Sequence, residues 1–367
     1  MQTKITFERK VLKANLELLA MAQSSKAIIP IMNYMKFVIK SGNMFMISTS
    51  EDISIKKHIG QTEAADMSFI FDAKPIISIL NKSSEVSVIL NFHDKGLDVY
   101  EGLTGEYNFP ILANPDEFPV FPKTDKDAVK FVVKGLELKK AIGTAIKYMG
   151  TNESIPFLNG LSIANKSGAL EIVASSGHTL AIEPIGKDPG NFDGIILPRR
   201  LAGFIHKLIV DMPVTIQATA ANTMFGISSD TVIHSKNMEG RIAGYMTVVP
   251  NKDTAIDTIT IDRLKFMEVV DKLNSIGNIL VFEIRNTIMT VTAENIETSR
   301  KAWNKLSVER IKNEDVKGSV NIDLLIDLLQ SNDKEMISLE LFPHTNGTIR
   351  AILDRNNHTH LLMCIVI

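Results

Sequence analysis

The segment Ser175-Ser176-Gly177-His178 places a serine and a histidine close together, the pairing that a nucleophilic hydrolase needs. A nucleophile elbow holds its serine between glycines, in the pattern GxSxG, on a turn from a strand into a helix. Here the segment follows one strand-like stretch and leads into another (residues 179–185), not into a helix. No orienting carboxylate is evident beside the segment. Catalysis at Ser175 and His178 therefore remains an alternative, and we predict no catalytic residues.

Metal and cofactor sites have no better support in the sequence. His358 and His360 lie two apart, on one face of an expected strand, and no third ligand is obvious nearby. Cys364 is the only cysteine, which excludes an internal disulfide and a zinc site with several cysteines and suits a reducing cytoplasm. The chain has no GxxxxGK[ST], GxGxxG or HExxH motif. We predict neither a metal nor a cofactor.

Basic residues on two expected helices give a clearer pattern. They form two groups of three: Lys139, Lys140 and Lys147, and Arg199, Arg200 and Lys207. Within each group two members are seven apart, which places them on one face of a helix. Such faces are often simply solvated, but side by side they can hold phosphates without reading bases. The net charge of −2 still allows a basic patch on an acidic body.

These residues belong to a unit that the chain repeats three times. Each copy opens with a short strand-like stretch and a helical pattern, at residues 5–7, 131–133 and 259–261. Each then has two strands joined by a tight turn, at Ser41-Gly42, Ser167-Gly168 and Arg285-Asn286. A second helix follows residues 72, 197 and 321. The copies are offset by 124 to 128 residues, the size of a folding domain.

The repeat predicts an α+β fold with three domains. Proline-containing connectors at residues 109–127 and 248–257 end the first two copies, because proline removes ladder donors and restricts its neighbour. We place the domains at residues 1–126, 127–253 and 254–367. Neither a signal-peptide core nor an apolar run of membrane-spanning length is present, so we expect a cytoplasmic protein.

Residues 155–250 carry a family resemblance. The motifs are, in order, 155–160 (IPFLNG), 174–181 (ASSGHTLA), 197–199 (LPR), 239–241 (EGR), Tyr245 and Pro250. In order and spacing they resemble those of bacterial sliding clamps, the β-subunit family of DNA polymerase III, and the resemblance extends over the whole chain. It implies a head-to-tail homodimeric ring of repeated clamp domains, with helices lining the hole and sheets outside.

The resemblance also implies a function and partners. A clamp encircles double-stranded DNA and confers processivity on the replicative polymerase, without catalysis. Its partners are the DNA polymerase III catalytic subunit, the clamp loader, and other polymerases and repair proteins that bind through short peptide motifs. An alternative is a specialised or mobile-element clamp that serves one polymerase.

Site residues follow from the matched positions. For DNA these are the six basic residues above with Lys26 and Asn152. The peptide pocket would consist of Leu158, Ser175, Gly177, His178, Thr179, Leu180, Ala243, Val248, Leu361, Met363, Cys364, Ile365 and Ile367. The dimer interface is expected at Tyr107 and Phe109 of the first domain, and at the first helix and the strand near residues 298–306 of the third.

The chain departs from the family pattern at several of these positions. The departures are Ile155, Ser176, Thr179, Ala243, Cys364 and Val366, where the family usually has Arg, Asp, Arg, Pro, Pro and Arg. The loss of a guanidinium at residue 179 removes a fixed fork of hydrogen-bond donors. We therefore expect a peptide preference that differs from that of typical clamps.

Overall fold

The computed structural model describes residues 2–24, 27–102, 105–166, 168–242, 244–312, 314–342, 348–352 and 358–365. The chain forms two compact units, which are described separately. The first consists of Met1–Leu136 and Leu208–Asn237, and the second of Glu137–Lys207 and Met238–Ile367.

In its described residues, the first unit contains the α-helices α1 and α2 and two sheets. Its elements are β1 (Thr3–Glu8), α1 (Arg9–Ala20), η1 (Pro30–Asn33), β2 (Met35–Lys40), β3 (Asn43–Thr49), β4 (Ile53–Gln61), β5 (Met67–Phe71), α2 (Ala73–Lys82), β6 (Ser87–His93), β7 (Gly96–Glu101), β8 (Gly105–Pro110), η2 (Pro115–Glu117), β9 (Val129–Val133), β14 (Val214–Ala218), β15 (Asn222–Gly226) and β16 (Thr231–Lys236). One sheet has the order β1-β6-β7-β8 and the other β5-β2-β3-β4-β16-β15-β14-β9.

The second unit contains the remaining elements. They are α3 (Gly135–Ala145, which starts at the end of the first unit), η3 (Ile146–Tyr148), η4 (Pro156–Asn159), β10 (Gly160–Lys166), β11 (Ala169–Ser175), β12 (Thr179–Lys187), β13 (Ile195–Pro198), α4 (Arg199–Leu208), η5 (Tyr245–Val248), η6 (Lys252–Thr254), β17 (Asp257–Asp262), α5 (Arg263–Asn274), β18 (Ile279–Arg285), β19 (Ile288–Asn295), β20 (Arg300–Ser307), β21 (Glu309–Arg310), β22 (Val316–Asn321), α6 (Ile322–Gln330), β23 (Met336–Phe342), β24 (Thr348–Ile352) and β25 (Thr359–Met363). Its sheets have the orders β13-β10-β11-β12-β25-β24-β23-β17-β21 and β20-β19-β18-β22.

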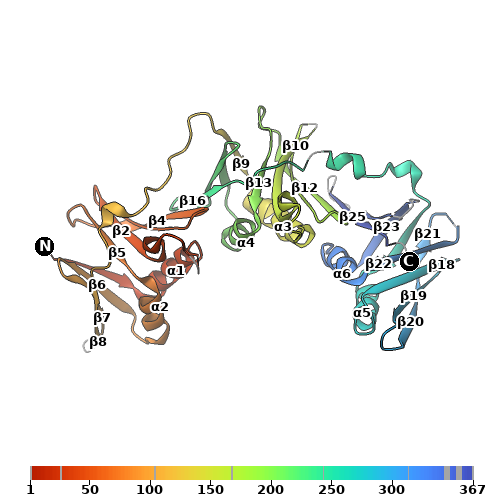
Figure 1. The fold of residues 1–367 in the computed structure, drawn as a ribbon, viewed down its shortest axis with the longest axis horizontal. Coiled ribbons are helices and arrows are strands. Elements are labelled where there is room, and N and C mark those ends of the chain that lie inside the picture. Colours follow the sequence, from red (N-terminus) through yellow and green to blue (C-terminus); the bar gives the residue numbers. More distant parts are fainter. Residues whose placement is uncertain are drawn as a thin grey trace. The chain divides into compact units, whose positions relative to one another are not determined.

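The order of elements repeats three times, as the sequence predicts (Figure 1). Each copy is strand, helix and three strands, followed by the same series again; only the short β21 is additional. The first hairpin turns at Ser41 (φ 50°) and Gly42 (φ 73°), and the third at Asn286 (φ 51°). These left-handed conformations favour glycine and asparagine. Arg285, which the sequence places in the turn, is the last residue of β18.

Strands from different copies complete the two large sheets. In the first unit β4 pairs with β16, and the facing residues Ile55 and Ile233 are fully buried. In the second unit β12 pairs with β25, where Leu180 faces Leu361 and both are buried. The same kind of junction, with apolar side chains closing over it, therefore occurs in both units.

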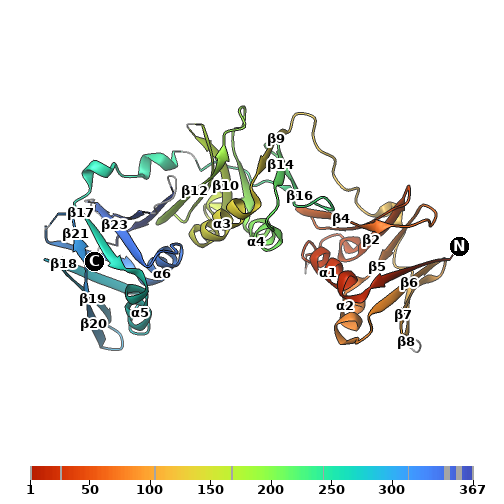
Figure 2. The same ribbon diagram turned by 180° about the vertical axis from the view of Figure 1, so that it is seen from behind.

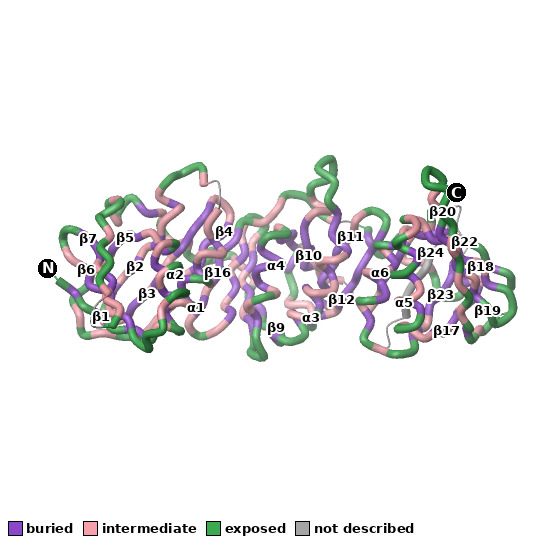
Figure 3. Tube along the Cα trace, turned by 90° about the horizontal axis from the view of Figure 1, so that it is seen from below, coloured by how far each residue is buried: buried purple, intermediate pink, exposed green. Residues whose placement is uncertain are grey.

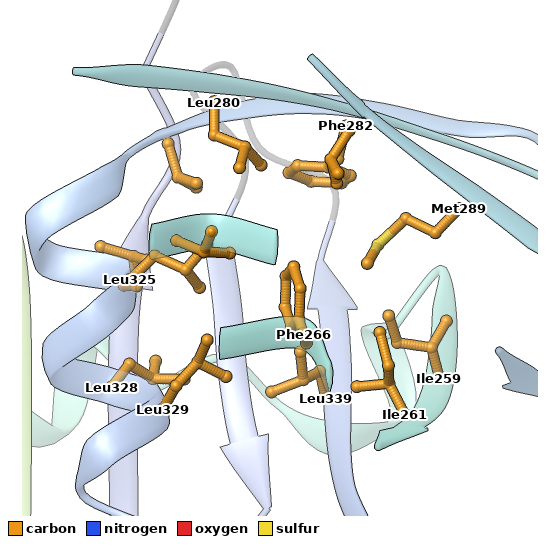
Figure 4. Packing of buried hydrophobic residues seen from close by; sticks show 14 of the residues in the cluster. Ile259, Ile261, Phe266, Leu280, Phe282, Met289, Leu325, Leu328, Leu329 and Leu339 are labelled. Carbon is orange, nitrogen blue, oxygen red and sulfur yellow. The ribbon is translucent and has the colours of Figure 1, made fainter. Parts of the chain in front are cut away.

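Each copy buries its helices against its strands. In the third copy, Phe266 of α5 and Leu325, Leu328 and Leu329 of α6 pack with strand residues such as Phe282 (Figure 4). Along the chain, buried stretches run through strands and inner helix faces, and exposed residues gather at turns and loops (Figure 3). No helix in the described part of the chain is long and apolar enough to cross a membrane.

Candidate functional site

Two helices of the second unit carry the six basic residues, and they lie side by side (Figures 1 and 2). A Cβ at Gly143 of α3 would come within 2.6 Å of Cε1 of His206 on α4, so only glycine allows this approach. Nδ1 of His206 lies 3.0 Å from the backbone oxygen of Lys139, which fixes the two helices to each other. The contact brings the two basic groups together on neighbouring helices.

Structural partners are seen for Lys140, Lys147 and Arg199. Lys140 forms an exposed ion pair with Asp333 at 2.9 Å, and Lys147 donates to Oε1 of Gln330 at 2.9 Å. Arg199 donates to the backbone oxygens of Met149 and Gly150, both at 2.9 Å. Because exposed ion pairs contribute little stability, Lys140 can exchange Asp333 for another anion at low cost.

The other predicted DNA contacts differ in their surroundings. Arg200 and Lys207 are exposed on α4, and Lys139 is half-buried on α3. Asn152 is exposed in the loop after η3, where its side chain accepts from the backbone N–H of Ser154 at 2.9 Å. Lys26 lies outside the described residues. The contact of all these residues with DNA stays a prediction.

An apolar pocket of about 770 Å³ opens elsewhere in the second unit. Its lining is Phe157, Leu158, Ser175, Gly177, His178, Thr179, Leu180, Arg241, Ile242, Gly244, Tyr245, Thr247, Val248, Pro250, Thr254, Phe342, Leu361 and Met363. Arg241 and His178 are the only lining residues in the described part of the chain that can carry a positive charge, and none is acidic. The pocket suits apolar side chains of a peptide or small ligand, with a few polar groups at its edge.

The structure brings nine of the thirteen predicted pocket residues around this one cavity. They are Leu158, Ser175, Gly177, His178, Thr179, Leu180, Val248, Leu361 and Met363. Cys364 and Ile365 are not part of the lining. Ala243 and Ile367 lie outside the described residues. That the nine residues bind a peptide remains a prediction.

The path of the chain after β25 explains why Cys364 and Ile365 are displaced. The backbone N–H of Ile365 donates to the oxygen of Ser319 on β22 at 2.7 Å, and the Ser319 hydroxyl donates to the oxygen of Ile365 at 2.5 Å. Cys364 packs against the core of the third copy, and burial raises the pKa of its thiol to about 11. The chain therefore turns from the pocket toward the neighbouring sheet after Met363.

A tight turn forms the edge of the pocket between β11 and β12. Gly177 has φ +88°, which favours glycine there. The Ser175 hydroxyl donates to the backbone oxygen of Thr179 at 2.7 Å and accepts from the N–H of Gly177 at 3.1 Å. The backbone oxygen of His178 accepts from the N–H of Met363 at 2.8 Å. Ser175 thus stabilises the turn and directs its proton to a carbonyl, which does not support the nucleophile alternative.

Half of the pocket lining was not predicted from the sequence. Arg241, Tyr245 and Pro250 stand in the motifs that carry the family resemblance, so their positions gave a usable signal. Phe342 and Thr254 gave none, because only the packing of the third copy brings them to this cavity. Phe157 likewise stands in the motif at residues 155–160, and Ile242, Gly244 and Thr247 are direct neighbours of predicted or motif residues.

The paired histidines contact one buried carboxylate. His358 and His360 hydrogen-bond to the two oxygens of Glu183 on β12, with His360 at 2.5 Å. Burial works to raise the pKa of Glu183, but the two histidines outweigh it and hold that pKa below its usual value. Among the described residues no group of three His, Cys, Asp or Glu side chains is arranged to hold a metal ion. The pair thus joins β25 to β12.

Tyr107 and Phe109, predicted at a dimer interface, lie on β8, an edge strand of the four-stranded sheet of the first unit. They face Val99 and Leu97 across the strand pair, so both point to the core side of the sheet. Val99 and Leu97 are fully buried, whereas Tyr107 is 38% exposed. The apolar face of this sheet is therefore buried at β7 but partly exposed to solvent at its edge strand β8.

Comparisons with known proteins agree with one another. Residues 3–122 match the family model described as DNA polymerase III beta subunit, N-terminal domain. A beta sliding clamp of Halalkalibacterium halodurans is 22% identical over 96% of this chain and 97% of its own. Over nearly its whole length the chain is similar to bacterial sliding clamps.

Solved structures show the clamp fold over the whole chain. A DNA polymerase sliding clamp from Pseudomonas aeruginosa matches with a TM-score of 0.90 at 18% identity, covering 99% of this chain and 100% of that one. A sliding clamp from the same organism bound to griselimycin matches with a TM-score of 0.89 at 17% identity, covering 99% of both chains. The α+β clamp fold predicted from the repeat and the resemblance is confirmed.

Proposed function

We propose that this protein is a DNA sliding clamp that confers processivity on the replicative polymerase by encircling double-stranded DNA. The observation that carries the proposal is the threefold element order of the clamp fold, matched over nearly the whole chain. In the proposed ring the basic faces of α3 and α4 contact phosphates. Such contacts need only be weak, because a closed ring stays on DNA topologically. The specialised-clamp alternative is not favoured, since the matching relatives are named beta sliding clamps.

Ring closure follows from the strand pairs within the chain. The third strand of the first copy, β4, pairs with the last strand of the second, β16. The same positions in the next two copies, β12 and β25, pair in the same way. By this rule β20 of the third copy would pair with β8 of the first copy in another molecule, and both end their sheets. A head-to-tail contact of this kind closes a ring of two chains.

The charges on β8 and β20 favour this pairing. Glu106 lies on β8, next to Glu101 at the end of β7. Arg300, Lys301 and Lys305 lie on β20. Two β8 strands would repel each other, and so would two β20 strands, whereas β8 with β20 joins opposite charges. Electrostatics thus select the head-to-tail contact over either self-contact.

The decisive experiment compares retention on circular and linear DNA. The protein is loaded onto nicked circular duplex with a clamp loader, and bound protein is measured by gel filtration before and after the circle is cut once. We expect stable retention on the circle and rapid loss after cutting. Equal retention on both forms would contradict encirclement.

A milder prediction concerns the phosphate contacts. We expect Lys207→Ala to reduce the slope of log K against log salt for duplex binding by about 0.9 per subunit, since each phosphate contact releases condensed counterion. Lys187→Ala is the matched control, because Lys187 is equally exposed but lies at the end of β12. Titration by fluorescence anisotropy at several salt concentrations measures both slopes. Identical slopes in the two variants would remove Lys207 from the DNA surface.

The pocket in the second unit is the proposed site for partner peptides. Its apolar lining and open edge suit a short extended segment with large apolar side chains. The partners proposed for it are the DNA polymerase III catalytic subunit, the clamp loader and other polymerases and repair proteins. Two related clamps were solved with griselimycin bound, so this molecule is a useful competitor in binding assays. A clamp acting in replication would work in the cytoplasm. Each subunit would consist of three domains, at residues 1–126, 127–253 and 254–367.

A further inference from the structure

One wall of the pocket is formed by the short segment η5, which is four residues long. It follows Gly244, whose φ of +69° turns the chain sharply. Of its residues only Tyr245 is buried, whereas Met246 is 38% and Val248 61% exposed. A segment of one turn has little intrinsic stability. Its position therefore depends on how the Tyr245 side chain is fixed.

Tyr245 is fixed at both its ring and its hydroxyl. The ring belongs to a small apolar cluster with Val173, Leu180, Ile182 and Leu361, of which Leu180 and Leu361 also line the pocket. The hydroxyl donates to Oε2 of Glu171 at 2.8 Å. This bond connects the wall to β11, a central strand of the nine-stranded sheet.

Burial of the Glu171 carboxylate at this position is energetically unfavourable. It is buried, its cross-strand neighbours Ala164 and Pro184 are uncharged, and burial raises the pKa of its carboxyl group. Lys166, at the end of β10, offsets part of this cost and also lies 5.4 Å from the Tyr245 ring centroid. A buried carboxylate needs such partners to be tolerated. Glu171 does not line the pocket and is linked to it by the hydrogen bond from Tyr245.

We propose that Glu171 is a positioning residue for the peptide pocket: through Tyr245 it holds the η5 wall in the binding position without touching the ligand. The inference rests on the proposed peptide-binding function of the pocket. It implies that peptide affinity depends on a residue behind the pocket, on the far side of its wall. A wall released from β11 would sample positions that do not contact the peptide, and affinity would fall by the fraction of time spent there.

The test uses three variants of the full-length chain and a fluorescein-labelled peptide from the clamp-binding segment of the same organism's polymerase III catalytic subunit. Glu171→Leu leaves the Tyr245 hydroxyl buried without an acceptor, and we expect about tenfold weaker binding. Glu171→Gln keeps an oxygen acceptor, and we expect affinity within about twofold of the parent. The third variant combines Glu171→Leu with Tyr245→Phe and removes both polar groups.

The combined variant separates positioning from stability. Replacing both partners of a buried hydrogen bond by apolar groups can be nearly neutral for folding, so its melting temperature should return close to that of the parent. The wall is still not tethered, so its peptide affinity should stay about tenfold reduced. Recovery of affinity together with melting temperature would overturn the positioning role. A parent chain that binds no peptide would instead overturn the proposed pocket function, and with it this inference.

Discussion

Tyr107→Asp is expected to convert the proposed dimer into monomers and to abolish retention on circular DNA. Within the chain, the equivalent junctions are closed by buried apolar pairs such as Ile55 with Ile233. Tyr107 is the corresponding apolar residue on β8, and it is 38% exposed in the single chain. In the proposed ring, a carboxylate at this position would be buried against β20 of the second molecule without a partner. The cost is about 2 to 4 kcal/mol at each junction. Because the proposed ring has two such junctions, its dimer should weaken by at least about a thousandfold.

Sedimentation velocity over a range of protein concentrations measures this change. Tyr107→Phe should behave as the parent, since the ring is retained and only a weak 3.4 Å contact with Glu101 is lost. Val120→Asp is the control for an added surface charge, because Val120 is 85% exposed in the connector of the same copy. A Tyr107→Asp protein that remains dimeric would show that β8 is not the contact strand.

Val248→Asp should eliminate most peptide binding while leaving the fold and the dimer intact. Val248 lines the pocket from η5 and is 61% exposed, so the substitution disturbs no core. Once an apolar peptide covers this position, the new carboxylate would lose water and gain no partner. The expected loss is about 2 to 3 kcal/mol, or roughly 30- to 150-fold in Kd.

Met246→Asp is the matched control for this substitution. Met246 belongs to the same short segment and is also exposed, but it is absent from the pocket lining. Fluorescence anisotropy with the labelled polymerase peptide, and displacement by griselimycin, compare the two variants. If both lose affinity equally, η5 as a whole is sensitive to charge and the pocket assignment of Val248 is wrong.

Local signals in the sequence predicted the repeated elements well. Gly42 and Asn286 mark hairpin turns because few other residues adopt a positive φ there. Asp72 and Asn321 precede helices because their side chains accept from the first free backbone N–H groups, at Lys74 and Leu324. Signals of this kind depend on only a few neighbouring residues, so one sequence is enough to read them.

Contacts between distant segments could not be predicted in the same way. Arg199 stands beside Arg200 in the sequence, yet its guanidinium is bound to backbone oxygens some 50 residues earlier. Cys364 follows the pocket residue Met363 directly, but it does not line the pocket. The hydrogen bonds between Ile365 and Ser319 direct the chain after Met363 toward β22, a strand of another sheet. Phe342 reaches the pocket only through the packing of the third copy. Such placements follow from tertiary packing, which overrides local pattern.

The pairing of β12 with β25 has a consequence during synthesis on the ribosome. Residues 179–182 pair with residues 359–362, about 180 positions later. At roughly 5 to 20 residues per second, the edge of β12 stays unpaired for about 10 to 40 seconds after it is made. An open strand edge can pair with other nascent chains. Glu183, near the middle of β12, places a charge on that edge until His358 and His360 arrive and hydrogen-bond to its carboxylate.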